Sequence, residues 1–73
     1  MNIINAIEKA LALCGADVEE IETLSAMRRE PLRFHRKPGW SVDYSTKAML
    51  TIDPGFVEVE VTDGGEAEVS DII

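Results

Sequence analysis

The segment VEVEVT at residues 57–62 constrains the fold more than any other part of the sequence. Valine alternates there with glutamate or threonine, which is the period-two pattern of a strand with one buried face. Turn signals flank the segment, with Asp53-Pro54-Gly55 before it and Asp63-Gly64-Gly65 after it. The sequence therefore predicts an antiparallel meander built around a strand at residues 56–62.

The hairpin after this strand can be given a register, because a slip of one residue would move every apolar side chain to the other face. A three-residue loop over 63–65 sets Val61 opposite Ala67 and Val59 opposite Val69. Glycine at the end of such a loop suits the left-handed conformation that is needed there. We therefore expect this longer loop in place of a two-residue Gly-Gly turn.

The strands before the segment follow from the same argument. A tight turn over 53–56 sets Ile52 opposite Val57, and the preceding loop sets Val42 opposite Leu50, so that apolar side chains share one face. The predicted strands are approximately residues 40–44, 48–53, 56–62 and 66–70.

Two helices are predicted before the sheet. Apolar residues at helical spacing, followed by Gly15 in the position of a C-terminal cap, predict a helix over 2–14. Asp17 can cap a second helix over 18–29, with acidic residues in its first turn and arginines in its last. The alternative is a strand over 18–24. The fold class is then α+β, with two N-terminal helices packed on one face of a four- to five-stranded antiparallel meander, in a single domain of residues 1–73.

The stretch RREPLRFHRKPGW at residues 28–40 holds five of the seven Lys and Arg residues, in a chain whose net charge is -7. Leu32 and Phe34 alternate with charged residues, which predicts a fifth, edge strand at 32–36 that sets Arg33 opposite Asp43. Cross-strand pairing and protection of the edge would account for part of the charge. The alternative is a partner-binding surface in which arginines stand beside an aromatic residue. Its candidate residues are Arg28, Arg29, Arg33, Arg36, Lys37 and Trp40.

Acidic residues dominate the C-terminal half, which has no Lys or Arg after Lys47. Glu58 and Glu60 alternate with the valines and are interpreted, with Glu68, as an acidic face of the sheet that is open to solvent. A flat face without a cleft is a poor active site for paired carboxylates. We therefore predict no catalytic residues here.

Cysteine and histidine each occur once, as Cys14 and His35. A single cysteine excludes a disulfide within the chain, and one Cys with one His argues against a structural zinc site. Cys14 falls on the buried face of the predicted helix, so no Cys–His catalytic pair is expected. The sequence predicts no metal and no cofactor. No run approaches the ~18 apolar residues of a membrane helix, and no targeting segment is visible, so a cytoplasmic protein without a membrane partner is expected.

These features predict a small, acidic, non-enzymatic protein-interaction module, acting as an adaptor, an inhibitor or a self-assembling subunit. Its partner would be another protein or further copies of itself. One alternative is an acidic decoy, of the type encoded by mobile elements, that inhibits nucleic-acid-binding machinery by imitating phosphate charge. The other is a weak nucleic-acid binder through residues 28–37, which the net charge of -7 disfavours.

Overall fold

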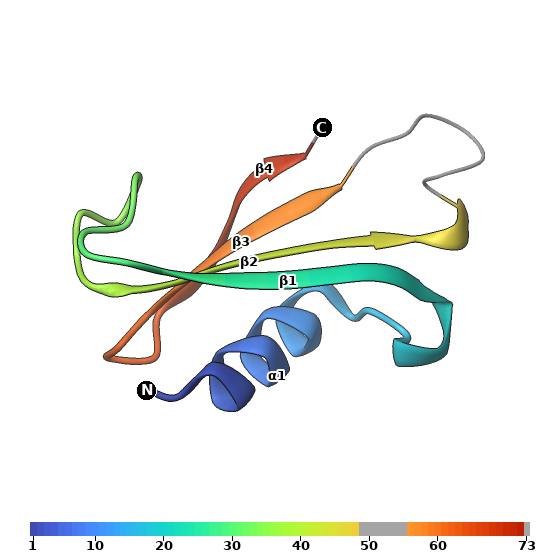
Figure 1. Cartoon of the computed structure of the whole chain (residues 1–73), viewed down its shortest axis with the longest axis horizontal. Helices are drawn as coiled ribbons and strands as arrows, with labels where there is room; N and C mark the ends of the chain where they lie inside the picture. Colours follow the sequence, from blue (N-terminus) through green and yellow to red (C-terminus); the bar gives the residue numbers. More distant parts are fainter. Residues whose placement is uncertain (49–55, 73) are drawn as a thin grey trace.

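The computed structural model describes residues 1–48 and 56–72, without the side chains of 71 and 72. Four strands form one antiparallel sheet in the order β1-β2-β3-β4, and one long helix crosses a face of this sheet (Figure 1). The α+β class is therefore confirmed, with one helix in place of two. In chain order the elements are α1 (Ile3–Cys14), η1 (Val18–Glu20), β1 (Ile21–Arg29), β2 (Gly39–Thr46), β3 (Val57–Thr62) and β4 (Ala67–Ile72).

The first predicted helix is confirmed as α1, and both of its ends have local causes. The Asn2 side chain accepts a hydrogen bond from the N–H of Asn5 at 2.8 Å, which satisfies a free donor of the first turn. Gly15 adopts φ 63°, the left-handed conformation of a C-terminal cap. Ala6 and Ala10 face the sheet and are fully buried, because their small side chains let the helix approach closely.

The core lies between α1 and the middle of the sheet. The helix packs against β2, β3 and β4. The buried side chains on this face are Ala6, Ala10, Val42, Tyr44, Val57, Val59 and Val61. In the described part of the chain no helix is long and apolar enough to cross a membrane.

The predicted helix over 18–29 is wrong. Asp17 caps as expected, accepting from the N–H of Glu19 at 3.0 Å, but only the single turn η1 follows. The chain then runs as β1 and pairs with β2, which sets Ala26 opposite Val42, so pairing with a partner strand overrides the local helix signals. The alternative strand over 18–24 was correct from residue 21 and stopped too early.

The strand between β2 and β3 is also wrong, because these two strands pair directly. Val42 lies opposite Val59, in the place predicted for Leu50, and Tyr44 lies opposite Val57, in the place predicted for Ile52. The predicted strand at 48–53 falls largely outside the residues that the structure describes.

The last hairpin confirms the predicted register. Val61 lies opposite Ala67 and Val59 opposite Val69, joined by the three-residue loop. Gly65 ends that loop with φ 94°, and its N–H donates to the carbonyl of Thr62 at 2.9 Å.

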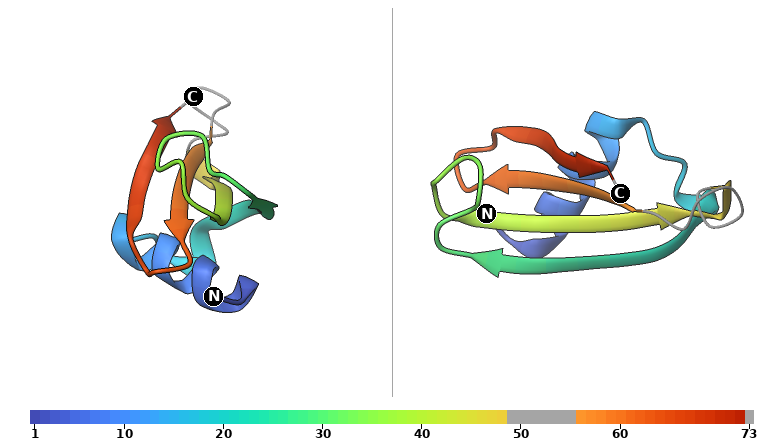
Figure 2. Two further views of the ribbon diagram at one scale, coloured as in Figure 1. Left: turned by 90° about the vertical axis from the view of Figure 1, so that its left-hand side faces the viewer. Right: turned by 90° about the horizontal axis from the view of Figure 1, so that it is seen from above.

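Residues 30–38 form a loop instead of the predicted edge strand at 32–36. The loop lies at one end of the sheet, on the side away from α1 (Figure 2). Two backbone hydrogen bonds close it, from the N–H of Leu32 to the carbonyl of Lys37 and from the N–H of Arg36 to the carbonyl of Leu32. Leu32 is buried beneath it. The predicted pairing of Arg33 with Asp43 is therefore wrong, since Ser25 of β1 lies opposite Asp43.

Candidate functional site

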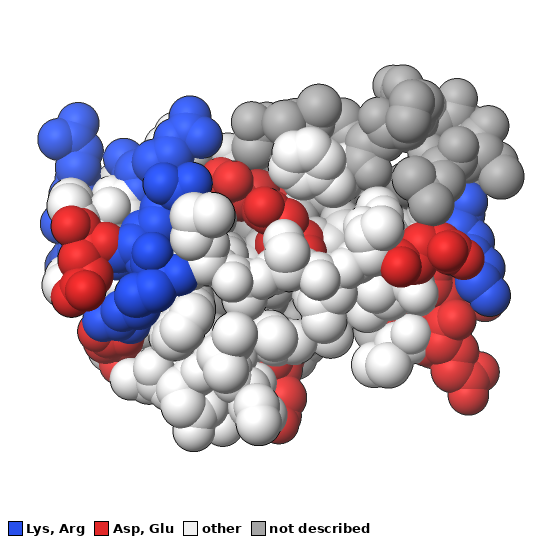
Figure 3. Space-filling model, in the orientation of Figure 1, with Lys and Arg blue, Asp and Glu red and all other residues white. Residues whose placement is uncertain are grey.

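The residues that were predicted to bind a partner lie together at one end of the sheet. The end of β1, the loop 30–38 and the start of β2 follow one another in the chain, so all three place their side chains there. Figure 3 shows lysine and arginine side chains gathered at this end, on the left. We call this set the basic cluster, and it consists of Arg28, Arg29, Arg33, Arg36 and Lys37, with Trp40 beside it.

Arg28 already has a partner inside the fold. Its guanidinium donates to both carboxylate oxygens of Asp63 at 2.6 Å and lies 5.5 Å from the centre of the Trp40 ring. This bidentate pair, with the N-terminal ammonium 3.6 Å from Asp63, holds the pKa of that carboxyl at about 2. Arg28 thus ties β1 to the turn between β3 and β4.

The other members of the basic cluster differ in how far their charge is compensated. Lys37 Nζ lies 3.1 Å from Glu66 in an exposed ion pair, which contributes little in water. Arg29 is half-buried, and its buried Nε has no hydrogen-bond partner in the part of the chain that the structure describes. Arg33 and Arg36 are exposed and form no ion pair within residues 1–48 and 56–72. These last two are therefore the charges available to a partner.

The predicted acidic face is mostly covered. Glu58 and Glu60 lie on the side of β3 away from α1, as the alternation requires, but they are only 8% and 1% exposed. The expectation that solvent surrounds them is wrong, because loop 30–38 covers Glu60 and Ser70 of β4 donates to Glu58 at 2.8 Å. Glu68, with its side chain 70% exposed, is the open member of the three.

The Glu60 carboxylate anchors the loop to the sheet. It accepts the backbone N–H groups of Phe34 at 3.1 Å and His35 at 3.0 Å, and His35 Nδ1 lies 3.1 Å from it. On the far side of the ring, His35 Nε2 lies 3.3 Å from Glu68. Burial alone would raise the pKa of Glu60, but the two backbone donors and the imidazole outweigh burial and lower it. The sequence carried no signal for this site, because the donors lie more than twenty residues before their acceptor.

Asp43 stands beside a like charge. It lies opposite Glu58 across β2 and β3, and its buried Oδ1 has no hydrogen-bond partner among the described residues. Burial, with the nearby Glu58 charge, raises the pKa of Asp43, and only Arg29 acts in the other direction. The protonated form of Asp43 is therefore favoured by the fold.

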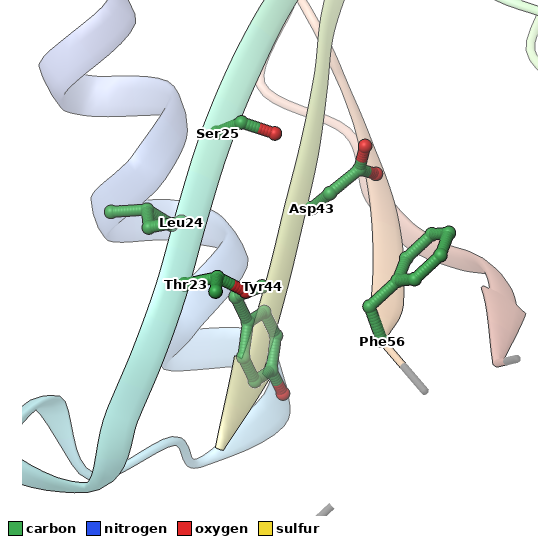
Figure 4. A pocket seen from close by; sticks show the side chains of 6 residues that line it. All are labelled: Thr23, Leu24, Ser25, Asp43, Tyr44 and Phe56. Carbon is green, nitrogen blue, oxygen red and sulfur yellow. The ribbon is translucent and has the colours of Figure 1, made fainter. Parts of the chain in front are cut away.

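A hollow of about 280 Å³ lies next to Asp43. The Ser25 hydroxyl and the Asp43 carboxylate point in the same direction from neighbouring strands (Figure 4). The full lining is Thr23, Leu24, Ser25, Asp43, Tyr44 and Phe56. It offers hydrogen-bonding groups but no histidine or cysteine. Among the described residues, no group of three or more His, Cys, Asp or Glu side chains is placed to hold a metal ion.

Cys14 and His35 lie on opposite faces of the sheet. Cys14 packs against the core under α1, beside Tyr44, whose pKa burial and the thiol together raise to about 12. His35 contacts Glu60 on the other face. The two side chains therefore do not form a nucleophile–base pair.

β1 is a nine-residue strand at the edge of the sheet. It pairs with β2 on one side, and on its other side Figure 2 shows no described segment. Leu24 and Met27 are 44% and 57% exposed on it, on opposite faces of the strand. Leu24 lies on the face of α1, which packs against the other three strands. This edge was not predicted, because the capping and charge pattern of residues 18–29 indicated a helix. Ile21 and Thr23, two β-branched residues directly after the capped turn, were the available signal for a strand.

Comparisons of the chain with protein-family models, with curated proteins and with solved structures found no match, so its function is argued from the geometry of these residues.

Proposed function

We propose that this chain is a non-enzymatic protein-interaction module that binds its partner by adding a strand to the edge of β1. One observation carries the proposal, namely that the outer edge of this nine-residue strand has no partner within the described residues. An unpaired edge offers a row of backbone donors and acceptors to an extended segment, and exposed side chains on both faces then provide specificity.

The basic cluster lies at the end of the same strand and supports the proposal. Arg33 and Arg36 are exposed there without ion pairs in the described part of the chain. Such rim charges accelerate association with an acidic partner and select its orientation. The cytoplasm remains the compartment that we propose, on the sequence alone.

Blocking the edge tests this proposal. Leu24→Lys with Met27→Lys places a charge on each face of β1, at positions that are already exposed. The matched control is Ile4→Lys with Leu13→Lys, which makes the same kind of change at two exposed positions of α1. Proteins captured from source cells by the immobilised chain are identified by mass spectrometry, and circular dichroism checks that each variant is folded.

We expect a captured partner to be lost with the β1 variant and kept with the α1 variant. Equal capture by the wild type and a folded β1 variant would show that the partner binds elsewhere and would overturn the proposal.

The acidic decoy and the nucleic-acid binder stay predictions. Burial of Glu58 and Glu60 leaves the decoy less exposed charge than the sequence suggested. Nucleic-acid binding would depend on Arg33 and Arg36. Fluorescence anisotropy with single-stranded DNA at low salt, repeated with Arg33→Ala plus Arg36→Ala, tests the second alternative.

A further inference from the structure

We propose that the strand added at the β1 edge is β1 of a second copy of this chain, in antiparallel pairing about a two-fold axis through Ser25. The two four-stranded sheets then form one continuous sheet across the dimer. This inference rests on the proposed function, since it uses the same edge, and it goes further by naming the partner and the register.

The register follows from the position of charges along β1. Ser25 is the middle residue of Ile21–Arg29, and β1 pairs with β2 without interruption from Thr23 to Arg29. Glu22 lies at the register shift between Ile21 and Thr23, directly before this regular segment. Pairing about Ser25 brings Glu22 to Arg28 of the second copy, and the two-fold axis makes this contact twice. Opposite charges that face each other across two strands stabilise the pair. Asp63 occupies two of the five N–H groups of the Arg28 guanidinium, and Glu30 Oε1 lies 3.8 Å from it, so donors remain for this contact.

Neighbouring registers lose this match. Pairing about Leu24 sets Glu22 opposite Ala26 and leaves the ends of both strands unpaired. Pairing about Ala26 moves Glu22 away from Arg28 and sets it opposite Glu30, one residue beyond the end of β1. Of the three registers, only pairing about Ser25 brings Glu22 to Arg28.

The segments directly before and after β1 also differ in charge. The turn before β1 is acidic and the basic cluster follows the end of β1. Most of the blue side chains in Figure 3 lie on the left, although side chains of both signs are visible at each end. Antiparallel pairing sets each acidic end beside the basic end of the other copy, whereas parallel pairing would bring like charges together. The acidic residues at the first end are Asp17, Glu19, Glu20 and Glu22.

The middle of β1 suits close approach by another strand. Thr23, Ser25 and Ala26 are small, and Leu24 and Met27 provide exposed apolar surface on the two faces. In the register about Ser25, Leu24 lies opposite Ala26 of the second copy. Met27 lies opposite Thr23 of the second copy, so each apolar side chain packs beside a smaller one. The complementary ends then fix the direction of pairing, so apolar contact and charge act together.

Sedimentation velocity over a range of concentrations tests the dimer with the variant Glu22→Lys. This change turns two attractive contacts into two repulsive ones, so we expect the dissociation constant of the dimer to rise about tenfold or more. Glu8→Lys is the matched control, because it makes the same charge change at an exposed position of α1. High salt should weaken the wild-type dimer and affect Glu22→Lys less. A wild-type chain that stays monomeric, or a dimer that is insensitive to Glu22→Lys, would overturn the proposal.

A cysteine scan along β1 tests the register. In a Cys14→Ser background, the variants Leu24→Cys, Ser25→Cys and Ala26→Cys are oxidised one at a time. Residues directly opposite each other in an antiparallel pair lie within reach of a disulfide, and those two or more positions apart do not. Ser25→Cys should therefore form a covalent dimer far faster than the other two. Faster linkage through position 24 or 26, or none at any position, would overturn the register.

The experiments distinguish failure of the proposed dimer from failure of the proposed interaction module. A monomeric chain that still captures another protein through β1 removes the dimer and keeps the interaction module. A chain that neither dimerises nor loses any partner when β1 is blocked removes both.

Discussion

Glu60 is buried yet held in its ionised form, because the backbone of loop 30–38 supplies donors where water would otherwise be. We expect Glu60→Gln to lower the free energy of unfolding by about 2 kcal/mol, since hydrogen bonds to a charged group are lost and an amide N–H₂ meets backbone donors. Urea unfolding measures the change. Glu8→Gln is the control, because it makes the same change at an exposed carboxylate of α1, away from loop 30–38, and should alter stability little.

The lowered pKa of Glu60 also predicts how stability depends on pH. A carboxyl whose pKa is lower in the folded than in the unfolded chain contributes stability that is complete above about 4.5, its ordinary value, and is lost as the pH falls through the folded value. The urea concentration at the unfolding midpoint of the wild type should therefore decrease as the pH is lowered below about 4.5. The Glu60→Gln variant should show a flatter dependence in this range, and a curve parallel to the wild type would contradict the assignment.

The raised pKa of Asp43 predicts that stability depends on pH in the opposite direction. Its raised pKa means that the folded chain favours the protonated form, so the ionised carboxylate weakens the fold as the pH rises above its ordinary value of 3.8. Asp43→Asn should raise the free energy of unfolding at neutral pH by up to about 1 kcal/mol, the range for like charges across two strands. Thermal unfolding at pH 7 measures this gain. The gain should shrink in acid, where the wild-type Asp43 is itself neutral; a less stable variant at pH 7 would refute the argument.

At the scale of elements, Gly39 lets the start of β2 lie close to both β3 and loop 30–38. A Cβ at this position would overlap the Val61 carbonyl oxygen and lie 2.7 Å from Leu32 Cδ1, so the strand and the loop can approach only around a glycine. We expect Gly39→Ala to cost about 1–3 kcal/mol in unfolding free energy, as overpacking does. Gly64→Ala is the control, because its Cβ would meet only Thr62 Oγ1, at 3.8 Å. Equal losses in the two variants would contradict this explanation.

Elements with local causes could be predicted from the sequence. The helix α1 follows from apolar spacing and Gly15, and the last hairpin follows from alternation and a glycine-ended loop. β1 could not be predicted, because its helix signals compete with a pairing to β2 that depends on residues far along the chain. The predicted strand at 32–36 failed because β1 occupies the place beside β2 that it needed.

The candidate site, like the fold, could be predicted only in part. The basic cluster is consecutive in the chain, so its gathering at one end of the sheet could be anticipated. The ion-pair partners of the basic cluster could not be predicted, since Arg28 and Asp63 are 35 residues apart. The burial of Glu60 beneath Phe34 and His35 could not be predicted either. These contacts depend on how the loop folds back over the sheet.

At the scale of the whole molecule, the core is small. In the described part of the chain its buried apolar side chains are mostly alanine and valine, which bury little surface each, so stability should be modest. A dimer adds stability by mass action, and we expect the midpoint of thermal unfolding to rise by about 5 °C over a hundredfold increase in protein concentration. Glu22→Lys should flatten this dependence. A wild-type midpoint that does not change with concentration would contradict dimerisation.

The two edges of the sheet are chemically unlike, and this decides how far assembly can proceed. β1 is long and carries exposed apolar residues, whereas β4 is shorter and carries the exposed Glu68. Each edge strand has one register shift against its neighbour. An isologous contact between two β1 edges leaves neither edge unpaired. Adding a third copy to the joined sheet would require pairing at the edge of β4. Short, charged edges resist such pairing. In the proposed dimer, assembly should therefore stop at two copies and not continue into open-ended filaments.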